Sequence, residues 1–221
     1  PATYERKPEP EPLPDWVTGE DEVFEDDEDF EEPIAAPAPI VSGKDEPVTV
    51  ANRPHVTFNS GNNEWYTPVE YIEAARLVMG KIDLDPASSD IANQTVQATT
   101  FYTAETDGLA QEWKGNVWMN PPYAGDLIGQ FVAKLIYHVQ RIDVRQAIVL
   151  VNNATETAWF NELISEATAV VFPRGRIKYL RPNGLPDAVG LQGQAFVYIG
   201  QNESTFLAEF SRFGWGATIE E

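Results

Sequence analysis

The sequence predicts an α/β protein with a mostly parallel, abbreviated sheet, an antiparallel C-terminal strand and a disordered acidic tail before the folded body. Short apolar runs alternate with amphipathic stretches along residues 63–221, as in strands joined by helices. The runs at 147–151 and 169–172 are apolar throughout, which is typical of strands buried on both faces. We therefore expect a tail at 1–47, a connector at 48–62 and one folded domain at 63–221.

The net charge of −20 lies mostly in the tail. Residues 1–47 carry 16 Asp/Glu and 3 Lys/Arg, a net of −13, and nine of the 17 prolines. Residues 48–221 carry 19 Asp/Glu and 12 Lys/Arg, a net of −7. Like charges that repel one another cannot form a packed core, so the tail is predicted to be disordered. The body is only mildly acidic, which leaves room for a local basic surface.

Composition excludes several kinds of chemistry. The chain has no cysteine, which excludes disulfides, cysteine-bound metals and thiol nucleophiles. His55 and His138 are the only histidines, so we expect no metal site. No apolar run approaches the ~18 residues of a membrane span, and no signal peptide is visible. The expectation is a soluble cytoplasmic protein.

The first half of the body reads as helix, strand, helix, strand. Thr67 is predicted to cap a helix that has Pro68 as its first residue and ends at Gly80. A short strand then ends at Asp85-Pro86. A helix at 93–98 and a strand at 99–103 follow.

The second half has a more regular pattern. Asp126 is predicted to cap a helix, with His138 near its end as a partner of the helix dipole. Further helices are expected at 156–167 and 204–210, and strands at 147–151, 169–172 and 194–199. The last of these strands is expected to be antiparallel, because a loop at 183–193 returns the chain to the sheet.

Between the halves, the apolar strand ending at Met119 runs directly into Asn120-Pro121-Pro122-Tyr123. The prolines stop the strand and fix the backbone, producing a rigid elbow. The Asn120 side-chain oxygen and the Pro121 carbonyl can each accept one N–H, and Tyr123 can stack on a planar ring. This set suits a planar ligand with an exocyclic amino group. The alternative is an ordinary loop, since Asn-Pro is a common turn starter.

This tetrapeptide resembles the catalytic motif of S-adenosylmethionine-dependent amino-methyltransferases. With the segments around it, the chain over residues 63–199 resembles the phage-type DNA N6-adenine methyltransferase (Dam) family. The resemblance implies a Rossmann-like methyltransferase sheet, S-adenosyl-L-methionine as cofactor and DNA as partner. It also implies a bacteriophage or bacterial enzyme in the host cytoplasm whose methylation of DNA evades restriction. The catalytic residues would be Asn120, Pro121, Pro122 and Tyr123.

The same resemblance assigns three segments to the cofactor. A Thr-Pro at a helix start contacts the cofactor carboxylate in related enzymes, and an acid after the first strand binds its ammonium or a ribose hydroxyl. An Asp-Gly-Leu before the catalytic strand binds the adenine amino group. The residues matched are Trp65, Tyr66, Thr67, Asp85, Pro86, Ala87, Ser88 and Asp107. Each segment also has a plain interpretation as a capped helix or a turn.

The chain departs from many methyltransferases in its nucleotide-binding half. It has no glycine between Gly80 and Gly108, and only 34 residues separate Asp85 from Asn120. We therefore expect a shortened half, and the residue that binds the cofactor ribose is not assigned.

The dense basic stretch at 174–181 suits phosphate contacts, with an aromatic residue to stack on an unpaired base. The residues are Arg174, Arg176, Lys178, Tyr179 and Arg181. The alternative is the solvated edge of a strand.

Three alternatives stay open. The chemistry could act on RNA or on a protein glutamine, or the fold could be catalytically degenerate and serve as an interaction protein. The acidic tail could bind a partner protein, or occupy the chain's own DNA groove as a DNA mimic. The groove hypothesis fails if deleting residues 1–47 leaves both the DNA affinity and its salt dependence unchanged. The oligomeric state is not predicted.

Overall fold

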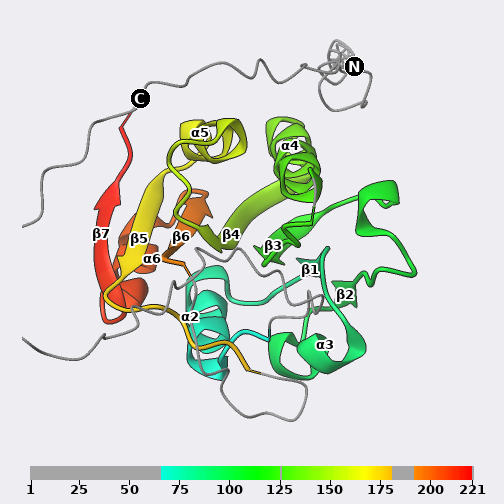
Figure 1. Ribbon diagram of the computed structural model, residues 1–221, viewed down its shortest axis with the longest axis horizontal. Helices are drawn as coiled ribbons and strands as arrows, with labels where there is room; N and C mark the ends of the chain where they lie inside the picture. Colours follow the sequence, from blue (N-terminus) through cyan, green and yellow to red (C-terminus); the bar gives the residue numbers. More distant parts are fainter. Residues whose placement is uncertain (1–65, 125, 181–191, 221) are drawn as a thin grey trace, which may run out of the picture. The chain divides into compact units, whose positions relative to one another are not determined.

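The computed structural model describes residues 66–124, 126–180 and 192–220 (Figure 1). The predicted tail and connector, together with Trp65, Arg181 and the loop at 183–191, lie outside the described residues. The helices are α2 (Val69–Met79), α3 (Asp90–Val96), α4 (Leu127–Gln140), α5 (Ala158–Ser165), α6 (Glu203–Phe210) and the 3₁₀ helix η1 (Gly108–Ala110). The strands are β1 (Leu84–Asp85), β2 (Thr100–Phe101), β3 (Gly115–Met119), β4 (Val144–Asn152), β5 (Ala169–Pro173), β6 (Gln194–Ile199) and β7 (Gly214–Thr218).

The described strands form one seven-stranded sheet in the order β2-β1-β3-β4-β6-β5-β7. The strands from β1 to β4 are parallel, while β6 runs antiparallel to both neighbours, β4 and β5. This confirms the predicted α/β class with a mostly parallel centre and an antiparallel C-terminal strand. Only β2 lies beyond β1 in the described sheet, so the first half is short, as expected. The edge strand β7, antiparallel to β5, was not predicted.

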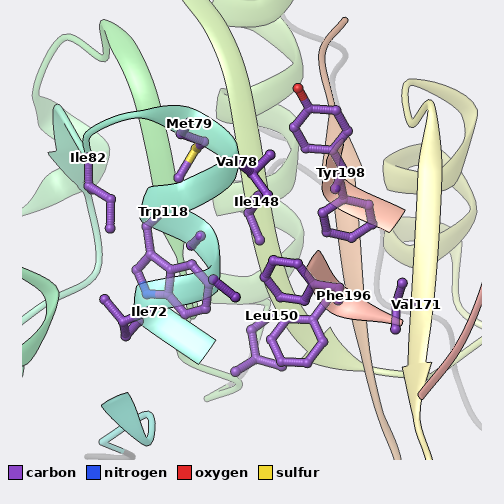
Figure 2. Packing of buried hydrophobic residues seen from close by; sticks show 14 of the residues in the cluster. Ile72, Val78, Met79, Ile82, Trp118, Ile148, Leu150, Val171, Phe196 and Tyr198 are labelled. Atoms are coloured by element: carbon purple, nitrogen blue, oxygen red, sulfur yellow. The ribbon is translucent and has the colours of Figure 1, made fainter. Parts of the chain in front are cut away.

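Both faces of the sheet are covered, which explains why its central strands are apolar throughout. Alternate residues of β3 point to opposite faces: Trp118 joins the cluster under α2 and α6, and Val117 joins the cluster under α4 and α5. Figure 2 shows Ile72 and Val78 of α2 packed near Trp118 and Ile148. The sheet is thus a rigid platform for the loops that leave its strands.

Several predicted element starts are corrected. Helix α2 begins one residue later than predicted, at Val69, and Pro68 occupies the N-cap position without a side-chain bond. Thr67 therefore does not cap the helix. Helix α3 begins at Asp90 instead of 93, because the Ser89 hydroxyl accepts the Ala92 N–H at 3.1 Å.

The predicted position of His138 near the end of α4 is confirmed, whereas the predicted role as a partner of the helix dipole is not supported. The residue lies in the last turn of α4 but is buried, stacked on Trp113 with ring centroids 6.2 Å apart. Its Nδ1 lies 3.2 Å from the Asp143 carboxylate. Burial lowers the pKa of His138 despite that carboxylate. Burial therefore disfavours the charged form of the ring, and His138 contributes to packing against Trp113.

Candidate active site

The sheet has a topological switch point between β1 and β3. From β1 it moves outward to β2, then returns to place β3 on the other side of β1. Open α/β sheets bind ligands at such a switch point, beyond the carboxyl ends of the strands. Asp85 ends β1 and Asn120 follows the end of β3, so these two polar side chains lie at the switch point.

Asn120 is linked to the start of the folded body. Its Nδ2 donates to the Thr67 hydroxyl at 3.5 Å, a long bond between residues 53 positions apart. Thr67 is only 7% exposed, and Asn120 is half-buried. The structure therefore brings the Thr-Pro segment and the Asn-Pro-Pro-Tyr elbow to one place. The Thr67 side chain meets the elbow in place of capping its own helix.

Tyr123 is fixed from two sides. Its hydroxyl accepts the backbone N–H of Asn152, where β4 ends. Its ring meets Trp159 edge to face, with centroids 6.4 Å apart at 70°. Burial raises the pKa of Tyr123, so the phenol stays neutral. Pro121 beside it is buried, whereas Pro122 is half-buried.

Asp85 is a buried carboxyl with few partners. It is 3% exposed, and its Oδ1 accepts the Ala87 N–H at 3.3 Å. Burial raises the pKa of Asp85 to about 7, against the opposing influence of Ser88 and the Ala87 N–H. The Ser88 hydroxyl is itself buried and makes no hydrogen bond of ordinary geometry to the described residues. Two poorly satisfied polar groups in one short segment are typical of a site that a ligand completes.

The Asp107 segment packs against the Asp85 segment. A Cβ added at Gly108 would lie 2.0 Å from the Pro86 carbonyl oxygen, so the two backbones are in close contact. Tyr102 connects them further, since its N–H donates to the Asp85 carbonyl at 3.0 Å. Asp107 is exposed, and its carboxylate accepts the Leu109 N–H at 3.0 Å. The structure thus places Asp107 next to the Asp85–Ser88 segment.

Replacing Gly108 with alanine should destabilise the protein by about 1–3 kcal/mol, the usual cost of overpacking. The added methyl would meet a backbone carbonyl, which cannot rotate away as a side chain can. Thermal melting of Gly108→Ala beside Gly129→Ala tests this. Gly129 lies inside α4, where a Cβ would meet nothing within 4 Å, so alanine there should stabilise by about 0.5–1 kcal/mol. Equal melting temperatures for the two variants would contradict the close contact.

The basic stretch is joined to the start of the body. Tyr66 and Leu180 exchange both backbone hydrogen bonds, at 3.3 and 2.8 Å. The Tyr66 side chain is buried at 7% exposure. This bridge anchors residues 174–180 near the Thr-Pro segment.

The predicted role of Tyr179 was wrong, because its side chain is only 8% exposed and joins the core. Burial raises the pKa of its phenol well above the ordinary value. Arg174, Arg176 and Lys178 are exposed, whereas Ile177 is buried like Tyr179. The alternation of residues 176–179 between polar and apolar, read with period 2, would have indicated that Tyr179 points inward.

Two further residues support the site and were not predicted. Asn152 supplies the N–H that holds the Tyr123 hydroxyl, and Trp159 supplies the ring beside it. The position of Asn152 after an apolar strand could have indicated a site residue, since parallel strands end at one edge. Nothing in the sequence distinguishes Trp159 from a core residue of α5.

An open hollow of about 500 Å³ lies at the opposite edge of the sheet, where β1 to β4 begin. Its four charged side chains are Asp83, Lys114, Asp143 and Arg145. Each has an opposite charge within 4.0 Å among the described residues. Ion pairs of this kind leave little unmatched charge for a ligand, and the hollow lies far from the switch point.

The mostly parallel sheet, the switch point with Asp85 and Asn120, and the reversed strand β6 together define an α/β protein of the Rossmann-like class. The family described as DNA N-6-adenine-methyltransferase (Dam) matches residues 55–197, and the chain belongs to that family. The match includes the elbow, the cofactor segments and the described basic residues, but ends before β7. No protein of curated function and no solved structure matched the chain. Within the described ranges, no helix is long and apolar enough to cross a membrane.

Proposed function

We propose that this chain is a DNA adenine N6-methyltransferase that uses S-adenosyl-L-methionine. Family membership supports a methyltransferase of DNA adenine. The observation that carries the proposal for these residues is the contact between Asn120 and Thr67 at the switch point, beside Asp85. It joins the segment assigned to catalysis with a segment assigned to the cofactor.

The residues present fit the cofactor chemically. Asp85 is a buried carboxyl whose neighbours, Ser88 and the Ala87 N–H, carry no charge. An ammonium or a ribose hydroxyl would supply a further donor to the Asp85 carboxylate. The first N–H groups of α2, beside Thr67, suit a carboxylate. Asp107 would accept from the adenine amino group. When bound, the cofactor supplies an electrophilic methyl group on sulfur.

Asn120 and Pro121 would act on the target amino group. The Asn120 Oδ1 and the Pro121 carbonyl each accept one N–H, which favours a tetrahedral nitrogen and localises its lone pair. The hydrogen bond from Nδ2 to the Thr67 hydroxyl would fix the orientation of the Asn120 amide and therefore the position of Oδ1. An amino group held in this way would be poised to accept the methyl group that the bound cofactor would supply, and the nitrogen would then lose one proton to solvent. Holding the two reactants in line supplies much of the acceleration.

The proton leaves after transfer, when the nitrogen is already acidic, so the chemistry requires no strong base. Tyr123 suits this scheme, since its pKa is raised and it stays a neutral phenol. Its ring would stack on an adenine flipped out of the DNA, returning part of the few kcal/mol that flipping costs. Arg174, Arg176 and Lys178 would meet phosphates. Such an enzyme would work in the cytoplasm of a bacterial or phage-infected cell and protect DNA from restriction.

Incubation with methyl-labelled cofactor and unmethylated DNA, followed by nucleoside analysis, tests the proposal. The expected product is labelled N6-methyldeoxyadenosine. Label that enters RNA or protein glutamine under the same conditions, but not DNA, would move the substrate to one of those classes. A chain that binds no cofactor in a titration would overturn the enzymatic proposal altogether.

A further inference from the structure

A buried glutamine holds the middle of the basic stretch. Gln194 is the first residue of β6, and it is only 5% exposed. Its Oε1 accepts the backbone N–H of Ile177 at 3.0 Å, and its Nε2 donates to the Gln192 carbonyl at 2.6 Å. Both ends of the amide are therefore bonded to backbone groups, which fixes its orientation. Ile177 lies outside the strands, so the glutamine side chain takes the place that a neighbouring strand would have as partner of this N–H.

The same glutamine lies beside the strand end that holds Tyr123. Gln194 is paired in register with Asn152 of β4, and the N–H of Asn152 donates to the Tyr123 hydroxyl. The pairing continues past the strands, because the Asn153 N–H donates to the Gly193 carbonyl at 3.1 Å. Gln194 thus connects the basic stretch to the Tyr123 half of the elbow.

A second connection joins the basic stretch to the other half of the elbow. The bridge between Tyr66 and Leu180 places the end of the stretch next to Thr67. The Thr67 hydroxyl in turn contacts the Asn120 amide. Lys178 lies between the two connections along the chain and is exposed. The backbone therefore fixes where this cation begins relative to Asn120, and only the flexibility of the lysine side chain remains.

Methylation of a flipped adenine requires that the DNA be held in a fixed register. Phosphate contacts set that register, although they carry no sequence information. The nucleotide leaves the stack by rotating about its backbone, so its phosphates stay with the duplex while its base enters the site. A cation that contacts such a phosphate must therefore lie at a constant distance from the site that receives the base. A basic stretch connected to both halves of the elbow provides that constant distance.

Resting on the proposed DNA methyltransferase function, we propose that Gln194 is a positioning residue for the DNA backbone. Its hydrogen bond to the Ile177 N–H keeps Lys178 at a fixed distance from the elbow. Lys178 then contacts a phosphate of the duplex beside the flipped adenine. Gln194 acts through the basic stretch and touches neither the base nor the cofactor.

Fluorescence anisotropy with a labelled, unmethylated DNA duplex tests this role. Gln194→Met keeps the length of the side chain but removes both polar ends, so the Ile177 N–H loses its partner. The variant should bind the duplex about 10-fold more weakly, and the slope of log affinity against log salt concentration should become shallower by about one, as for the loss of one phosphate contact. A purely structural defect would lower stability without changing that slope. Affinity for S-adenosylmethionine should be unchanged.

Gln146→Met is the matched control. The Gln146 Oε1 accepts the Tyr198 hydroxyl at 3.0 Å near the start of β4, at the opposite edge of the sheet. This variant loses the same polar atoms and a hydrogen bond of the same length, but should leave DNA affinity and its salt dependence unchanged. Gln194→Asn keeps the amide and shortens its reach by one methylene group, so it should fold and show the changes of Gln194→Met to a smaller extent.

A double-mutant cycle with Lys178→Gln determines whether Gln194 acts through that cation. Alone, Lys178→Gln should make the salt slope shallower by about one. Added to Gln194→Met, it should cause little further loss, because the phosphate contact is already absent. Fully additive losses would overturn the proposal, as would wild-type DNA affinity in a folded Gln194→Met variant or an equal effect of Gln146→Met.

Failure of the methylation assay is a separate result, because DNA binding is measured without turnover. If the variants change DNA binding as expected but no methyl group is transferred, the proposed reaction fails and the positioning role stands. An active enzyme whose DNA binding is unaffected by Gln194→Met overturns only the positioning role.

Discussion

Asn120→Ala is expected to lower the rate of methyl transfer by at least about 10²–10³-fold, the usual effect of removing one preorganised polar contact from a reacting group. The variant loses the oxygen that would accept one N–H of the target adenine, so the lone pair is no longer localised. Burial of Asp85 and the contact between Gly108 and Pro86 do not involve this side chain. Cofactor affinity should therefore stay within a few fold of wild type. Single-turnover kinetics and a cofactor titration measure the two effects separately.

Two companion variants sharpen this test. Asn120→Asp loses the Nδ2 donor that reaches Thr67. Because it keeps an acceptor oxygen for the target N–H, it should retain more activity than the alanine variant. Gln94→Ala also removes a side-chain amide, but from an exposed position on α3, and should be fully active. An alanine variant at position 120 with wild-type turnover would refute the catalytic role. Loss of cofactor binding together with turnover would instead make Asn120 part of the cofactor site.

The sequence predicted the sheet better than the ends of its elements. Apolar runs such as 147–151 are typical of strands buried on both faces, and their short length favours a strand over a helix. The cap at Thr67 failed because a competing partner, the Asn120 amide, lies far away in sequence. The strand β7 was missed because its sequence, Gly-Trp-Gly-Ala-Thr, has little of the β-branched and aromatic character of strands. Gly214 is required there, since a Cβ would lie 1.9 Å from the Phe172 carbonyl oxygen.

The candidate site was predictable where local chemistry was distinctive. Two prolines after a buried strand force an elbow whatever the rest of the chain does. Tyr179 was misplaced because an aromatic residue between cations has the same local pattern whether it points outward or inward. Its burial depends on the bridge between Tyr66 and Leu180, a tertiary contact.

Asp85→Asn is expected to stabilise the cofactor-free protein at pH 8 and to weaken cofactor binding. Burial raises the pKa of Asp85 from 3.8 to about 7, so between about pH 4 and pH 7 the folded state holds a proton that the unfolded state has lost. Stability therefore falls as pH rises through this window, and the cost of the buried charge is complete above about pH 7. That cost is on the order of a few kcal/mol. The neutral amide does not ionise, so thermal melts of the two proteins should diverge at pH 8 and converge near pH 4.

The expected loss of cofactor affinity follows from the unfavourable burial of the Asp85 carboxylate. A buried carboxylate with only uncharged neighbours gains most from a ligand that donates to it, and a hydrogen bond to a charged group is worth about 1.5–3 kcal/mol. Asp85→Asn should therefore bind S-adenosylmethionine about 10- to 150-fold more weakly. Asp90→Asn, at the exposed start of α3, is the matched control and should bind normally.

Proton release distinguishes this role from a purely structural one. A ligand that donates to Asp85 favours its ionised form, so cofactor binding at about pH 6 should expel a proton from the wild-type protein. Titration calorimetry in two buffers with different ionisation enthalpies counts that proton. The asparagine variant has no proton to release at this position, so it should release fewer protons than the wild-type protein, whereas Asp90→Asn keeps Asp85 and should release as many as the wild type. If Asp85→Asn binds the cofactor tightly and still releases the proton, Asp85 does not belong to the cofactor site. Its burial at the switch point would then have no ligand to account for it.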